Sequence, residues 1–132
     1  MGDRANVVVV PDGNPQQAVY LYTHWGGYAL PERLQTALRK HWRWEDEAYL
    51  ARIIFDTMTD GEHGKETGYG ISACLGDNSY PLLVVDVLAQ TVGLAKEQEF
   101  PVTYRTWSFT DFCELDLSDE WAALAPDNDN PG

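Results

Sequence analysis

With 132 residues, of which 44% are hydrophobic, the chain is long enough to bury one core and is unlike a disordered acidic tail. Its formal net charge of −12, from 21 acidic and 9 basic residues, argues against direct binding to nucleic acid or to an anionic membrane, because both need a positive surface. We expect one domain over residues 1–125 and a disordered acidic tail over residues 126–132.

A β-hairpin followed by two helices is predicted for the first half of the chain. Residues 6–10 are β-branched, residues 18–25 alternate in polarity, and an Asp-Gly-Asn-Pro turn joins these two strands. Pro31 favours the start of a helix, in which apolar residues follow at helical spacing. The acidic run 45–47 favours the start of a second helix.

The second half predicts three more strands and a short helix. Residues 69–75 and 81–88 are joined by a Gly-Asp-Asn-Ser turn and predict a second hairpin. Residues 102–109 alternate as a last strand, and Ser118 suits the cap of a helix over residues 119–124. The predicted fold is α+β: an antiparallel or mixed sheet of about five strands, two central helices packed on one face, and a short C-terminal helix.

The two cysteines indicate the compartment. Cys74 and Cys113 are far apart in sequence and form no CxxC motif, which is typical of reduced thiols. The start of the chain has no apolar stretch of the kind found in signal peptides, and no apolar run is long enough to span a bilayer. We therefore expect a cytoplasmic protein that does not enter a membrane.

The segment from residue 20 to residue 32 contains the best candidate site. An alternating strand runs into an aromatic corner, a Gly-Gly turn and a proline that opens a helix. Aromatic planes stack on a base or ring, and glycine N–H groups near a helix N-terminus favour an anion. The candidate ligand-binding residues are Tyr22, His24, Trp25, Gly26, Gly27, Tyr28 and Arg33. The alternative is a tight turn whose aromatic side chains pack on the sheet, since a Gly-Gly turn alone is a weak phosphate signal.

Asp86 is the most informative acid, because it lies inside the apolar run Leu-Val-Val-Asp-Val. A buried carboxylate has to be paired or hydrogen-bonded, otherwise its pKa rises. We expect a structural buried acid that bonds Arg105 or Tyr104 on a neighbouring strand. The alternative is that Asp86 supports a functional site.

Spacing predicts no catalytic site, no metal site and no cofactor. His24, His41 and His63 form no metal-binding motif with one another or with the cysteines. No Ser-His-Asp or Cys-His arrangement can be assembled, and Asp77 is explained by the turn in which it lies.

The C-terminal segment is acidic from residue 116 onward and contains no basic residue. The candidate partner-binding residues in it are Asp116, Asp119 and Glu120. One interpretation is that this charge only keeps the protein soluble. The sharper interpretation is an acidic face that docks on a basic partner.

Three segments resemble those of a set of small uncharacterised proteins found in bacteria, especially actinobacteria, and in their phages. They are Gly-Asp-Arg-Ala at residues 2–5, Leu-Tyr-Thr-His-Trp-Gly-Gly at residues 21–27 and Gly-Asp-Asn-Ser-Tyr-Pro at residues 76–81. The family pattern is a GNRA-like start followed by a YLHW-GG motif. The resemblance covers about the first quarter of the chain well, carries no activity to transfer, and implies a small phage or mobile-element accessory protein that acts by binding.

The leading hypothesis is a non-catalytic acidic binding protein that inhibits or modulates a host protein, such as a defence or nucleic-acid-binding protein, in the host cytoplasm. A second hypothesis is a small-molecule binder that sequesters a nucleotide at the corner over residues 22–28, with a homo-oligomer left open. A third is a hydrolase-type enzyme that uses Asp86, Asp77 and His24.

Overall fold

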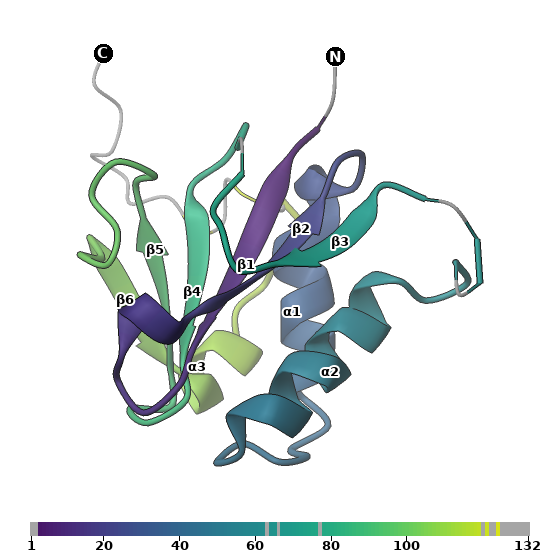
Figure 1. Ribbon diagram of the computed structural model, residues 1–132. Helices are drawn as coiled ribbons and strands as arrows, with labels where there is room; N and C mark the ends of the chain where they lie inside the picture. Colours follow the sequence, from purple (N-terminus) through teal and green to yellow (C-terminus); the bar gives the residue numbers. More distant parts are fainter. Residues whose placement is uncertain are drawn as a thin grey trace.

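The fold is built around one mixed β-sheet, in a computed structural model that describes residues 3–62, 64–65, 67–76, 78–119, 121 and 124 (Figure 1). The strands are β1 (Ala5–Val10), β2 (Val19–Thr23), β3 (Tyr69–Ser72), β4 (Leu82–Asp86), β5 (Thr91–Ala95) and β6 (Arg105–Ser108). Their order across the sheet is β3-β2-β1-β4-β5-β6. β1 and β4 are parallel, and the other neighbours are antiparallel. The predicted α+β class and mixed sheet are confirmed.

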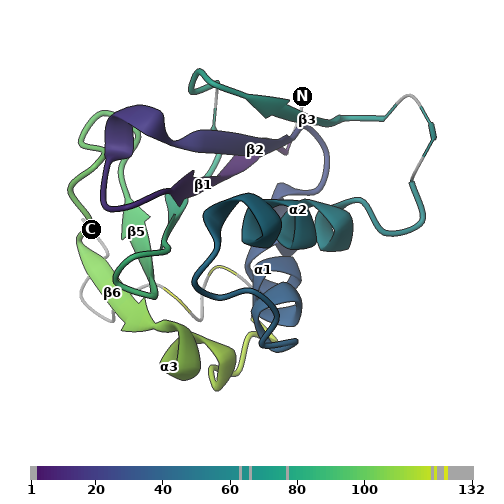
Figure 2. The same cartoon turned by 60° about the horizontal axis from the view of Figure 1, so that its bottom comes forward.

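Three helices cover one face of the sheet (Figure 2). They are α1 (Leu30–Leu38), α2 (Glu47–Met58) and α3 (Phe109–Cys113), and short 3-10 turns occupy Pro15–Gln17 and Gly27–Ala29. The Asp46 side chain accepts hydrogen bonds from the first N–H groups of α2, and Ser108 does the same for α3. These caps explain why α2 and α3 begin where they do, whereas α1 has no side-chain cap and begins at Leu30-Pro31.

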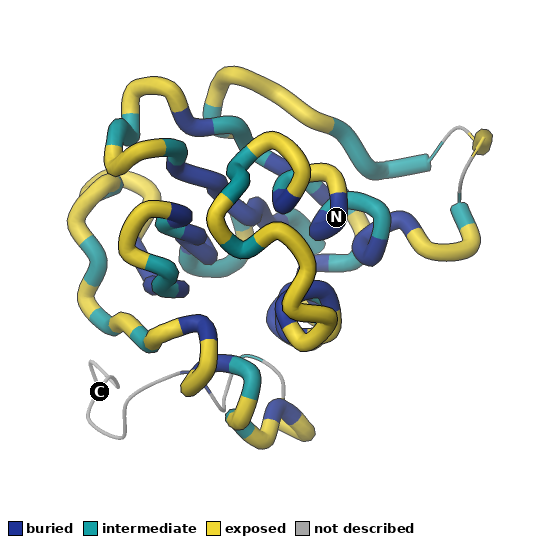
Figure 3. The backbone as a smooth tube through the Cα atoms, turned by 90° about the horizontal axis from the view of Figure 1, so that it is seen from below, coloured by how far each residue is buried: buried dark blue, intermediate teal, exposed yellow. Residues whose placement is uncertain are grey.

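The hydrophobic core lies mainly between the sheet and the helices. All six residues of β1 are buried, because the helices cover one side of this central strand and loops cover the other. Residues on the helix face, such as Val7, Leu21 and Leu83, pack against Leu34 and Ile54. A smaller apolar cluster forms on the opposite face. Figure 3 shows the buried segments enclosed by exposed turns.

The predicted second hairpin is wrong. β3 and β4 follow each other in sequence, but β3 pairs with β2, whereas β4 lies between β1 and β5. The turn sequence between them is compatible with a hairpin, yet the apolar β4 is buried more completely beside β1 at the centre of the sheet. Tertiary burial therefore overrides the local turn signal.

β5 is the strand that the sequence pattern misses, because Gly93 interrupts it. A Cβ atom on Gly93 would lie 2.7 Å from the Thr103 side chain, so the glycine permits a close approach of the chain before β6. The last strand begins at Arg105 and gives way to α3 at Phe109, which is the C-terminal helix of the described chain. The helix predicted over 119–124 and the tail over 126–132 fall largely outside the described residues.

Candidate functional site

A cleft of about 730 Å³ opens beside the aromatic corner that follows β2. Its walls come from the end of β2, the start of α1, the end of α2 and the start of β3. The lining residues are His24, Trp25, Gly26, Tyr28, Ala29, Leu30, Arg33, Met58, Glu62, Thr67, Gly68 and Tyr69. Five of the candidate ligand-binding residues are therefore brought together, namely His24, Trp25, Gly26, Tyr28 and Arg33.

Trp25 is the most prominent side chain of the cleft. It is 62% exposed, yet it has fixed neighbours. The His24 ring meets the indole edge-on with centroids 4.1 Å apart. A Cβ atom on Gly68 would lie 2.6 Å from the indole Cδ1, so the glycine lets β3 pass close to the ring. Together with Tyr28, which is 59% exposed, Trp25 presents an aromatic surface of the kind that stacks on ligands or partners.

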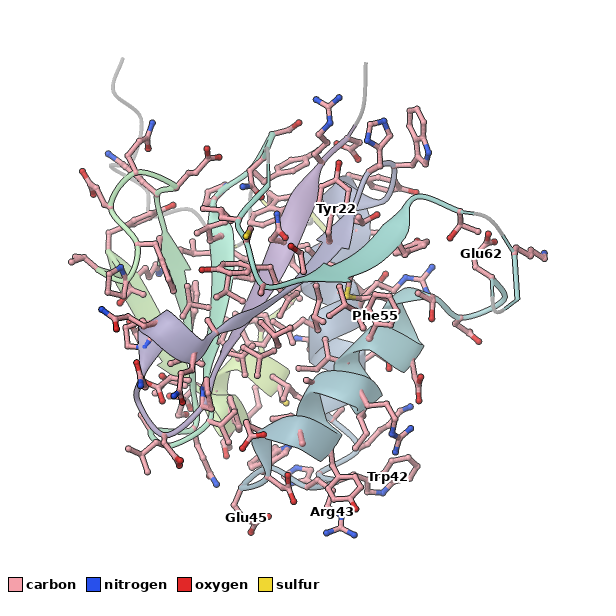
Figure 4. All side chains as sticks on the ribbon, in the orientation of Figure 1. Tyr22, Trp42, Arg43, Glu45, Phe55 and Glu62 are labelled. Atoms are coloured by element: carbon pink, nitrogen blue, oxygen red, sulfur yellow. The ribbon has the colours of Figure 1, made fainter. Side chains whose placement is uncertain are left out.

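His24 links the cleft to the opposite face of the sheet. Its Nδ1 accepts a hydrogen bond from Arg4 Nε at 3.4 Å, because a guanidinium is only a donor. The Tyr22 hydroxyl lies 3.0 Å from the same Nδ1. Tyr22 itself does not line the cleft but a separate hollow on the face away from the helices (Figure 4).

The Gly-Gly turn is not the open anion site that its sequence suggests. The Gly26 N–H donates to Thr23 Oγ1 at 2.9 Å, and the Gly27 N–H donates to the Asp3 carbonyl at 2.8 Å. The Tyr28 N–H donates to Asp3 Oδ2 at 2.8 Å. The expectation that the two glycines offer free N–H groups to a ligand is therefore wrong, because the Asp3 carboxylate already occupies the anion position.

Gly27 is explained by packing. A Cβ atom there would lie 2.5 Å from the Asp3 carbonyl oxygen and 2.8 Å from the Tyr80 ring. The Gly27 carbonyl accepts a hydrogen bond from Trp121 Nε1 at 2.7 Å, and the Trp121 and Tyr80 rings stack with centroids 4.7 Å apart. The turn is therefore a structural junction between the two ends of the described chain.

Arg33 and Glu62 supply the charge in the cleft. Arg33 is half-buried on α1, and its Nη1 donates to the Thr57 carbonyl at 3.4 Å, which is a long bond. Glu62 lies on the segment that follows α2 (Figure 4). One cation and one carboxylate beside two exposed aromatic rings suit an uncharged or zwitterionic ring compound better than a polyanion.

Asp86 is not the buried acid that the sequence suggests. It is half-buried at the end of β4, where Oδ1 accepts the Ala89 N–H at 3.1 Å and so supports the turn into β5. Arg105 instead donates to the Leu124 carbonyl at 2.8 Å. Asp86 is also far along the sheet from His24, because Asp86 pairs with Val10 at one end of β1.

His24 lies near the opposite end of β1. Ala5, at the start of β1, pairs with Thr23, which directly precedes His24. The structure therefore does not bring Asp86 and His24 to one site, and Asp77 and His63 lie outside the described residues. Within the described ranges, no group of three or more His, Cys, Asp or Glu side chains is placed to hold a metal ion.

The candidate partner-binding residues Asp116 and Asp119 follow α3, and Asp111 on α3 and Glu114 directly after it add two further acids. Asp111, Glu114, Asp116 and Asp119 are exposed, and we call these four residues the α3 acidic segment. The Ser118 backbone N–H donates to Asp116 Oδ1 at 3.0 Å, and this bond lowers the pKa of Asp116. Glu120, the third predicted partner-binding residue, lies outside the described residues.

Comparisons of the chain with protein-family models, with curated proteins and with solved structures found no match. In the part of the chain that is described, none of the helices has both the length and the apolar composition needed to cross a bilayer.

Proposed function

We propose that this protein is a non-catalytic binding protein whose negatively charged surface docks on a basic partner. The observation that supports it is the shortage of internal charge pairing. Among the described residues, the only ion pair is the one between Arg52 Nη1 and Asp56 Oδ2, 2.6 Å apart within α2. With a net charge of −12, most surface carboxylates are left for an external cation.

Several basic side chains contact carbonyl groups or aromatic rings instead of carboxylates. Arg39 Nε donates to the Cys113 carbonyl at 2.9 Å. Lys40 lies over the Trp42 ring and Arg43 over the Tyr49 ring, at 5.2 and 4.5 Å from the centroids. Figure 4 places Trp42 and Arg43 at the turn between α1 and α2.

The α3 acidic segment is the proposed centre of this surface. Its four carboxylates follow one another over Asp111–Asp119. Arg39 contacts this segment, but it donates to the Cys113 backbone carbonyl and not to a carboxylate. Such a surface attracts a basic partner at long range and favours its orientation. The resemblance to phage-linked proteins favours a host protein, such as a defence or nucleic-acid-binding protein, which this chain would inhibit or modulate.

Neutralising the segment tests this proposal. The variant D111N/E114Q/D116N/D119N should lose a basic partner captured from host lysate, and the wild-type complex should weaken as salt rises from about 0.1 M to about 1 M, since the screening length falls from about 10 to about 3 Å. The control D12N/E32Q/E45Q/D60N removes the same charge at exposed positions elsewhere. Equal capture by wild type and the α3 variant would refute the α3 surface.

A second function is supported by the cleft alone. Trp25 and Tyr28 form an exposed aromatic rim over about 730 Å³, a volume in the range of small-molecule sites. The ligand class is a nucleoside or nucleotide whose base stacks on Trp25. Because Asp3 fills the Gly-Gly turn, a phosphate would have to reach Arg33.

Thermal shifts with nucleosides and nucleotides test whether the cleft binds such ligands. A ligand at one hundred times its Kd stabilises the folded state by about 2.7 kcal/mol, which is easily measured as a higher Tm. We expect nucleosides to stabilise the wild type and to have no effect on Trp25→Ala. No shift with any nucleoside or nucleotide would remove this second function and leave the first intact.

A further inference from the structure

The outer edge of β3 differs in charge from the rest of this chain. Residues 67–76 contain no charged side chain, although 23% of the chain is charged. β3 is an edge strand, and no described strand pairs with its outer side (Figure 2). Ile71, in the middle of this run, is 60% exposed. Natural edge strands are usually protected by charges or prolines, and this edge has neither.

The hydrogen-bond pattern identifies which backbone groups face outward. The His24 N–H donates to the Gly68 carbonyl at 2.7 Å, so these opposing residues form a bonded pair. In an antiparallel ladder, bonded pairs alternate along the strand. With Tyr22 opposite Gly70, the backbone of Gly70 is therefore directed at β2. The N–H and C=O groups of Tyr69 and Ile71 point away from the sheet.

Hollows lie on both sides of this edge. On the helix face, a mainly apolar groove of about 200 Å³ lies between α2 and the strands β2 and β3, lined among others by Phe55, Arg52 and Ile71. Phe55 lies on the side of α2 that faces the sheet (Figure 4). On the other face, a hollow of about 260 Å³ is bordered by Gly70, Ser72 and Cys74. An added strand would place alternate side chains over these two hollows, because successive side chains of a strand point to opposite faces.

We propose that the outer edge of β3 pairs with an extended segment of the partner that is apolar in its centre and basic at its ends. Charge argues for this occupant. In sequence, the segments that flank the uncharged run contain three acids, Glu62, Glu66 and Asp77, and one base, Lys65. A second copy of this chain would bring the same acids against themselves at a net charge of −12 for each copy. The proposal rests on the proposed function, because it gives the same basic partner a second contact, at the sheet edge opposite β6, the strand that leads into α3.

A defined peptide pair tests the edge directly. The probe is the peptide Lys-Val-Thr-Val-Thr-Val-Lys, and its control has Glu at both ends. In NMR titrations of the full chain, the basic-ended peptide should shift the amide signals of residues 67–74 and slow hydrogen exchange at Tyr69 and Ile71. It should bind about tenfold more tightly than the acidic-ended peptide. No shift at residues 67–74 with either peptide, or equal binding of both, would overturn the proposal.

Two substitutions at Ile71 distinguish a loss of binding at the β3 edge from a loss of folding. Ile71→Lys adds a repelling charge, and Ile71→Pro removes an N–H that faces away from β2 together with the apolar side chain; each should weaken peptide binding about tenfold. Thr106→Lys adds the same charge to β6 at the opposite edge, where Thr106 is exposed, and should leave binding unchanged. Circular dichroism and Tm identify any variant that fails to fold, and the other Ile71 variant then decides the result.

Two further outcomes show whether a partner or a second copy occupies the edge, and whether the edge proposal can fail while the proposed function stands. A dimer in sedimentation that dissociates in Ile71→Lys would assign the edge to a second copy and overturn the partner assignment. If both Ile71 variants retain capture of the basic partner while neutralisation of the α3 acidic segment abolishes it, the edge proposal fails and the proposed function stands. If the Ile71 variants lose capture of the basic partner and the basic-ended peptide binds more tightly than the acidic-ended one, the edge proposal and the proposed function are both supported.

Discussion

The Tyr80 hydroxyl donates a hydrogen bond to Asp3 Oδ1 over 2.5 Å, and so joins two residues 77 positions apart in the chain. The other oxygen of the same carboxylate accepts the Tyr28 N–H, at the start of the segment that leads into α1. One aspartate thus ties the first strand, the Gly-Gly turn and the start of β4 together. The packing at this junction accounts for Gly27, where a Cβ atom would lie 2.5 Å from the Asp3 carbonyl oxygen.

Removing the hydroxyl should weaken the fold. We expect Tyr80→Phe to lower the free energy of unfolding by about 1–2 kcal/mol, because the Asp3 carboxylate loses a donor while the ring stacking on Trp121 is kept. Urea denaturation measures the difference. Tyr49→Phe is the control, since Tyr49 is exposed on α2, and a loss of similar size there would contradict the special role of Tyr80.

The same bond predicts a pH dependence. The hydrogen bond to Asp3, followed by burial, raises the pKa of Tyr80 from 10.0 to about 12. A pKa that is higher in the folded state means that the contribution of Tyr80 is complete below about pH 10 and is lost as the pH rises through about 12. The stability difference between wild type and Tyr80→Phe should therefore shrink over this window. A difference that stays constant to about pH 12 would show that Tyr80 is not the titrating group.

Gly27→Ala should be costly for a steric reason. The added Cβ atom meets the Asp3 carbonyl oxygen at 2.5 Å, which is backbone and cannot rotate away. We expect a loss of about 2–3 kcal/mol in the free energy of unfolding. Gly70→Ala is the matched control, because a Cβ atom at Gly70 has no neighbour within 4 Å. A neutral Gly27→Ala would mean that the turn is looser than the structure indicates.

Gln35 should prove structural although it is polar. Its Nε2 donates to the carbonyls of Phe112 and Leu115, at 3.0 and 2.8 Å, and so holds the end of α3 against α1. Gln35→Leu removes the Gln35 donor from both carbonyls. The Phe112 carbonyl keeps the Leu115 N–H at 3.3 Å, so the loss falls mainly on the Leu115 carbonyl, and we expect a cost of about 1–3 kcal/mol. Thr36→Leu, on the exposed side of the same helix turn, should change stability by less than about 0.5 kcal/mol. Thermal unfolding of both variants decides the matter.

The two cysteines should differ in reactivity. Cys74 is exposed, whereas burial raises the pKa of the half-buried Cys113 thiol, with Arg39 opposing this shift. At neutral pH, a thiol reagent should modify Cys74 about tenfold faster, since the thiolate is the reactive form. Mass spectrometry of the labelled peptides identifies the site, and Cys74→Ser should remove the fast phase. Equal rates at the two thiols would refute the assigned exposures.

The interpretation of the corner after β2 shows where sequence reasoning reached its limit. Aromatic residues next to a Gly-Gly turn predict a candidate site, and Trp25, Tyr28 and Arg33 line one cleft. The rest of the lining, including Met58 and Gly68, comes from segments remote in sequence. No local pattern predicts these residues, because they share only a position in space.

Composition and periodicity by themselves determined the α+β class, the first strand, the two central helices and the excess of negative charge. These follow from local physics: β-branched runs bury as strands, and apolar residues at helical spacing form one buried face. Only the tertiary structure decided that β3 pairs with β2 and that Asp3 fills the Gly-Gly turn. Both outcomes depend on which distant groups become neighbours once the core has formed, and burial at the centre of the sheet outweighs any turn preference.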